Sequence, residues 1–133
     1  PMIILDVAHN PAAAAVLAQN LAATPCAGRT YAVFSMLQDK DIQGVVQKLK
    51  DEIDVWLLFP IQSPRAATVE HIAEEIGNAG FSDINQSICR FSDGVEAFAF
   101  ACEQASKNDR ICIFGSFYTV GDVLNHLHMS SRE

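Results

Sequence analysis

This chain begins with a short apolar segment that ends at Asp6. An alanine-rich segment follows it within a few residues. Residues 2–6 form a short, nearly continuous apolar run of the kind found in buried parallel strands. Asn10 can cap a helix that has Pro11 at its first position, and the alanines that follow predict a helix over 11–23. Asp6, His9 and Asn10 therefore lie on one strand-to-helix turn. In a parallel sheet such a turn lies at the carboxyl edge, where ligands bind.

The same order of strand and helix repeats along the rest of the chain. Further strands are expected at 29–36, 53–59, 82–90 and 110–114, and helices at 40–51, 69–78, 94–106 and 119–128. Asp39, Thr68 and Asp93 are the expected N-caps of the helices that begin near 40, 69 and 94. Five β-then-α units predict an α/β, three-layer, Rossmann-like domain with a mostly parallel sheet of five to six strands and helices on both faces.

Two features of this prediction are left open by the sequence. The segment 82–90 is short and weakly patterned, so it could also be an antiparallel strand or a loop, and the strand order is not specified.

We expect one domain over residues 1–128 and a frayed tail over 129–133. The chain opens on a strand at Pro1, and we expect it to be a fragment of a larger protein.

The bulk composition excludes several classes of partner. Hydrophobic residues make up 50% of the 133 residues, so a core can form, while the net charge of −7 argues against nucleic acid or an anionic membrane as a partner. No apolar run approaches the roughly 20 residues of a membrane span. The four cysteines contain no C-x-x-C pair, and we interpret them as reduced thiols of a cytoplasmic protein.

The first turn is the strongest candidate site. Asp6 can accept hydrogen bonds from ribose hydroxyls, and His9 at a helix N-terminus can donate to a phosphate. The alternative is that Asp6 only ties down the turn and His9 only packs. A metal site is disfavoured because D-x-x-H supplies two ligands and no cysteine pair completes the set.

Polar side chains also follow the other expected strands. Asp39 and Asp41 are the residue types that a helix start favours, while Lys40 between them could reach a nucleotide. Arg65, in a loop that contains two prolines, is either an anion clamp or a surface arginine. Ser116 follows a glycine after the last strand, and without a G-x-S-x-G motif it is interpreted as a binding hydroxyl and not a nucleophile.

The two common phosphate-binding signatures are absent from the sequence. Neither G-x-x-x-x-G-K-[ST] nor G-x-G-x-x-G occurs. The domain is therefore not expected to hold the triphosphate of a nucleotide by itself. His71, His126 and His128 have no suitably spaced partners and are interpreted as surface residues.

Four motifs, in order, resemble one family. They are LDVAHNP at 5–11, SMLQDKD at 35–41, PRAAT at 64–68 and FGSFYTV at 114–120. Together they resemble the C-terminal domain of the bacterial bifunctional dihydrofolate synthase/folylpolyglutamate synthases of the Mur ligase superfamily. The first motif is shared loosely with peptidoglycan Mur ligases, and the second and fourth are more specific to the folate enzymes.

The resemblance implies part of an ATP-dependent amide ligase. An acyl phosphate would form on a pteroate or folate carboxyl and be attacked by the amino group of L-glutamate. A separate N-terminal P-loop domain would hold most of the ATP and the Mg²⁺, and this domain would close over the cleft and be inactive alone. By position, the resemblance assigns Asp6 to the ribose and His9 to the phosphates, and Asn10 is expected to contact the nucleotide with them. It assigns Ser116, with Arg65 as a further contributor, to glutamate.

The chain departs from the family pattern at four positions, and two other classes of protein remain as alternatives. Val7, Ser35 and Ala66 stand where the family often has glycine, and Tyr118 stands where it often has histidine. A peptidoglycan ligase domain is disfavoured because the segment 60–65 lacks Asp-Asn-Pro-Arg. A non-enzymatic regulatory module of receiver type would need an aspartate at the end of the third strand, which instead ends Phe59-Pro60.

Overall fold

The sheet is parallel throughout and has five strands. The computed structural model of the chain describes residues 1–81, 87–116, 120–121 and 123–125. The strands are β1 (Met2–Leu5), β2 (Thr30–Phe34), β3 (Val55–Leu58), β4 (Ile88–Arg90) and β5 (Arg110–Phe114), in the spatial order β1-β5-β2-β3-β4. The predicted fold class is confirmed. The doubtful fourth strand is real but short, and it pairs parallel to β3, while the residues 82–86 of that prediction lie outside the described part.

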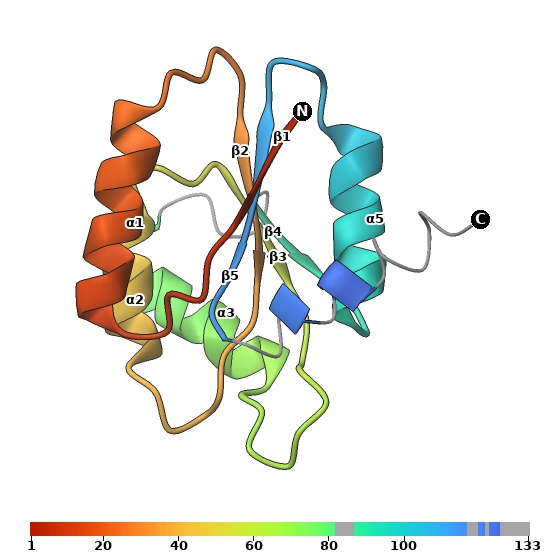
Figure 1. The fold of residues 1–133 in the computed structure, drawn as a ribbon. Coiled ribbons are helices and arrows are strands. Elements are labelled where there is room, and N and C mark those ends of the chain that lie inside the picture. The colour runs from red at the N-terminus through yellow and green to blue at the C-terminus, as the bar shows by residue number, and fades with distance from the viewer. Residues whose placement is uncertain (82–86, 117–119, 122, 126–133) are drawn as a thin grey trace.

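Helices cover both faces of the sheet, as predicted (Figure 1). The helices α1 (Pro11–Ala23), α2 (Ile42–Leu49) and α3 (Val69–Asn78) pack on one face. The helix α5 (Gly94–Gln104) packs on the other, where Val120 and Val123 join the same cluster. Alternate strand residues serve the two layers, because successive side chains point to opposite faces: Phe34 faces α1 and α2, whereas Val33 faces α5. No helix in the described part is long and apolar enough to cross a bilayer.

An aromatic cluster lies directly beneath the carboxyl edge. Phe34 and Phe114 are the last residues of the adjacent strands β2 and β5, and their ring centroids are 4.8 Å apart. The indole of Trp56 on β3 lies 5.4 Å from the Phe34 ring in an edge-on arrangement. All three side chains are fully buried. Such contacts add to the burial energy and hold these three strands, β5, β2 and β3, in place relative to one another.

Three of the four helix starts follow the predicted caps. Asn10 Oδ1 accepts from Ala13 N at 2.8 Å, and the side chains of Thr68 and Asp93 cap α3 and α5 in the same way. The prediction for α2 was wrong. Asp41, not Asp39, is its N-cap and accepts from Gly44 N at 2.9 Å, so the helix begins at Ile42. Of the last predicted helix, residues 120, 121 and 123–125 are helical, and its remaining positions and the tail lie outside the described residues.

Candidate functional site

The predicted site residues lie along one edge of the sheet. Because all five strands are parallel, their carboxyl ends form a single row, at the lower side of the sheet in Figure 1. The strand order places the turn of Asp6 and His9 beside Ser116, which follows the neighbouring strand β5. The loop after β2, with Asp39 and Lys40, comes next, and the loop after β3 with Arg65 follows it.

Asp6 uses half of its carboxylate to shape the first turn. Its backbone N–H donates to Ile113 O at 3.0 Å and so extends the pairing of β1 with β5 by one residue. Its Oδ1 accepts from Ala8 N at 2.7 Å, while Oδ2 makes no hydrogen bond to any described residue. The carboxylate therefore ties down the turn and still offers one acceptor to a ligand. A shallow depression beside it is lined by Leu5, Val7, Val120 and Leu124.

The ring of His9 is held by the main chain of the same turn. Its Nδ1 lies 2.9 Å from Val7 O, and since a carbonyl oxygen only accepts, Nδ1 carries a proton. Nε2 is therefore the nitrogen that a ligand can reach, and it donates a hydrogen bond only in the imidazolium form. Asn10 is more committed, because its Oδ1 caps α1 and only its amide nitrogen remains for a ligand.

Ser116 reaches the edge through a turn that requires glycine. Gly115 has a φ of +116°, which residues with a side chain rarely adopt. A Cβ at this position would collide with the carbonyl oxygen of Ser35 and lie 3.1 Å from the ring of Phe34. Ser116 itself is only 5% exposed, and its carbonyl oxygen accepts from Val120 N at 3.3 Å. Ser116 is thus held, nearly buried, at the exit of β5, an interior strand of the sheet.

Asp39 and Arg65 form an ion pair that the sequence did not reveal. Arg65 Nη2 donates to Asp39 Oδ2 at 2.6 Å, and this hydrogen bond holds the pKa of Asp39 below its usual value. The two loops also pair through an antiparallel bridge between Leu37 and Ala66. The sequence does show opposite charges after two different strands. These charges predict an ion pair only once β2 and β3 are known to be neighbours. Lys40 is half-buried and makes no side-chain hydrogen bond or ion pair within the described part.

The described residues of the site include no set of metal ligands. Among the described residues, no group of three or more histidine, cysteine, aspartate or glutamate side chains could hold an ion. The donors present at the edge therefore do not fit a Mg²⁺ site of their own.

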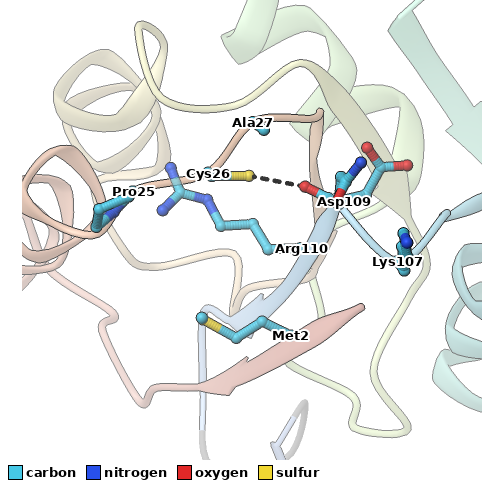
Figure 2. A pocket seen from close by; sticks show the side chains of 8 residues that line it. Met2, Pro25, Cys26, Ala27, Lys107, Asp109 and Arg110 are labelled. Atoms are coloured by element: carbon cyan, nitrogen blue, oxygen red, sulfur yellow. Dashed lines mark hydrogen bonds between the residues drawn. The ribbon is translucent and has the colours of Figure 1, made fainter.

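A polar pocket lies at the opposite edge of the sheet, where the strands begin (Figure 2). Its buried Arg110 donates to Thr30 Oγ1 at 2.7 Å, and to the carbonyl oxygens of Leu21 and Thr24, at the end of α1, at 2.9 and 3.2 Å. Cys26 Sγ donates to Asn108 O at 3.5 Å. These polar groups bind the chain itself, so we interpret this pocket as a structural joint between α1, β2 and β5.

Comparison with known proteins places the chain in a family. Residues 1–117 match the family model described as Mur ligase, glutamate ligase domain. The chain is 39% identical over 124 residues to the dihydrofolate synthase/folylpolyglutamate synthase of Escherichia coli, covering 93% of this chain and 27% of that protein. The relative from Mycobacterium tuberculosis is 39% identical over 108 residues, covering 81% and 22%. The chain therefore belongs to the Mur ligase family, as a glutamate ligase domain.

Solved structures narrow the comparison to the folate enzymes. The structure described as E. coli FolC in complex with DHPP and ADP superposes with a TM-score of 0.87 at 36% identity, covering 98% of this chain and 29% of that chain. A bifunctional folylpolyglutamate synthase/dihydrofolate synthase with Mn, AMPPNP and L-glutamate bound gives 0.86 at 38% identity, covering 96% and 29%. Within its family the chain is thus similar to the C-terminal domain of these synthases, and it spans less than a third of their length.

Proposed function

We propose that this chain is the nucleotide- and glutamate-contacting domain of an ATP-dependent ligase that joins L-glutamate to dihydropteroate or folate. The observation that carries the proposal is the family match over residues 1–117 to glutamate ligase domains. The polar atoms of Asp6, His9 and Arg65 that make no hydrogen bond within the described residues support it, because ligands of open α/β sheets bind at this edge. The solved relatives described with ADP, AMPPNP and L-glutamate support the choice of ligands.

The two halves of the edge would then bind different ligands. Asp6 Oδ2 would accept from a ribose hydroxyl, beside an apolar wall that suits a nucleoside, and His9 Nε2 would donate to a phosphate oxygen. Ser116 and Arg65 would hold the amino acid, the hydroxyl as a hydrogen-bond partner and the guanidinium as a partner of a carboxylate. Asn10, which follows His9 on the same turn, and Lys40, in the loop after β2, would assist at the phosphates.

The remaining parts of the reaction would belong to the rest of the protein. ATP supplies the phosphoryl group that activates the substrate carboxyl. We propose that residues 1–128 form one domain. We also propose that a P-loop domain in another part of the full-length protein holds the triphosphate and the Mg²⁺, since the described residues here form no metal site. Four unpaired cysteines and the use of ATP favour a cytoplasmic location.

The proposal is tested by comparing the 133-residue chain with the full-length protein that contains it. We expect the full-length protein to turn over dihydropteroate, ATP and glutamate, and the 133-residue chain to show no turnover and at most weak nucleotide binding. The measurement is the formation of ADP together with the glutamylated product. Turnover by the 133-residue chain alone, or none by the full-length protein, would contradict the proposal.

A further inference from the structure

A tight turn fixes the main chain at Arg65. Ala66 N donates to Ser63 O at 3.1 Å, and Arg65 N donates to Ser63 Oγ at 3.1 Å. Pro64 occupies the second position of this turn, where the fixed φ of its ring suits the geometry. The Cα of Arg65 is therefore held firmly relative to β3.

The loop after β2 is fastened to this turn by backbone hydrogen bonds. Gln38 N donates to Arg65 O at 2.8 Å, and Ala67 N donates to Met36 O at 2.9 Å. Leu37 and Ala66, which face each other in this short antiparallel ladder, pack against the core on the α5 side. Asp39 comes one residue after the ladder, so the backbone keeps its carboxylate within reach of Arg65 without help from the charges.

The ion pair itself is exposed, with 60% of the Arg65 side chain and 52% of the Asp39 side chain accessible. Exposed pairs add little to stability, so its main physical consequence is the direction of the guanidinium. The contact uses Nη2, while Nε and Nη1 make no hydrogen bond to any described residue. Resting on the proposed function, we propose that Asp39 is a positioning residue, which aims the unused donors of Arg65 at a carboxylate of the incoming glutamate.

The alternative role for Asp39 is competition with the substrate carboxylate for Arg65. The geometry favours positioning for two reasons. The contact occupies one of three guanidinium nitrogens and leaves the rest of the fork for a second carboxylate. The backbone ladder also holds the two loops together, so the Asp39 carboxylate stays within reach of Arg65 when a substrate carboxylate binds.

The test is steady-state kinetics of the full-length ligase with Asp39→Ala. We expect the KM for glutamate to rise about tenfold, while kcat and the KM for ATP change less than about twofold. The reason is that the contact between Arg65 and the glutamate carboxylate is weakened equally in the ground state and in the transition state. Asp39→Glu should recover part of the loss. The matched control is Glu70→Ala, which removes the other exposed pair of this edge, Arg90 Nε to Glu70 Oε1 at 2.7 Å, and should leave both KM values unchanged.

A charge swap separates positioning from a purely structural role. Asp39→Arg combined with Arg65→Asp keeps an ion pair between the loops but removes the fork from position 65, and we expect it not to restore the KM for glutamate. Restoration by the swap, or an unchanged or lower KM in Asp39→Ala, would overturn the positioning role. Absence of turnover in the unmodified full-length protein would instead contradict the proposed function, so the two failures are distinguishable.

Discussion

At the carboxyl edge, one side chain can have one polar atom that is hydrogen-bonded within the fold and another that is available to a ligand. Asp6 Oδ1, Asn10 Oδ1 and His9 Nδ1 are each used within the turn of residues 6–13. Asp6 Oδ2 and His9 Nε2 remain available, on two of the three side chains, Asp6, His9 and Asn10, that the sequence predicts to contact a nucleotide. Residue types and their order led to the choice of Asp6 and His9, which stays a prediction. They were not sufficient to say which atom of each side chain the fold would consume.

The cysteines give a prediction at this scale. Burial, and secondarily the Asp6 carboxylate, raise the pKa of Cys112 to about 12. Partial burial also raises the pKa of Cys102, but this residue lies on the exposed side of α5, where the reagent can reach it. Since only the thiolate reacts, iodoacetamide at about pH 8 should label Cys102 in the folded chain and leave Cys112 unmodified. Mass spectrometry of the labelled peptides measures this. Labelling of Cys112 at a rate similar to that of Cys102 would contradict the described core, and unfolding in urea should make both reactive.

Among the elements, the helix starts show how far local signals reach. Asn10, Thr68 and Asp93 were predicted correctly as caps, because each is the one capping residue placed directly before a helical pattern. Before α2 two aspartates compete, and the choice of Asp39 was wrong. The deciding fact is that Arg65, 26 residues away in the sequence, binds Asp39 and leaves Asp41 to cap the helix. No local pattern contains that information.

A turn at the amino-terminal edge gives a prediction at the scale of elements. Asp109 accepts from the backbone N–H groups of Ser106 and Arg29 at 2.8 and 2.7 Å, and so joins the start of β5 to the start of β2. These hydrogen bonds, that of Ser106 first, lower the pKa of Asp109. A lowered pKa in the folded state stabilises the fold above the unfolded pKa of about 4, and that contribution is lost as the pH falls through the folded pKa.

Asp109→Asn should therefore lower the melting temperature at pH 7, and the difference from the unmodified chain should shrink as the pH approaches about 2. Thermal unfolding followed by circular dichroism at a series of pH values measures this. Asp51→Asn, at an exposed position two residues after α2, is the matched control and should leave the melting temperature at pH 7 unchanged. A difference that stays constant across the pH range would show that the carboxylate charge has no part in holding this turn.

At the scale of the whole molecule, the strand order decides what the edge can do. Alternating strand and helix patterns predicted a parallel sheet, and therefore a common edge for all the polar strand ends. The order β1-β5-β2-β3-β4 could not be predicted, because it depends on which crossovers pack best and not on any one segment. This order places the first and last motifs of the chain, around Asp6 and Ser116, on adjacent strands. In the proposed site, the nucleotide contacts of Asp6 and His9 therefore lie at the β1 end of the edge, and Ser116 lies between them and the loop of Arg65.

The most direct test of the proposed site is the kinetics of the full-length ligase with His9→Ala, compared with His71→Ala on the exposed face of α3 as a matched control. If His9 donates to a phosphate of ATP, its removal loses a hydrogen bond to a charged group. The value of kcat/KM for ATP should then fall about 10- to 100-fold, with the melting temperature unchanged. His71→Ala should behave like the unmodified enzyme. Unchanged kinetics in His9→Ala would contradict the assignment of this turn to the nucleotide.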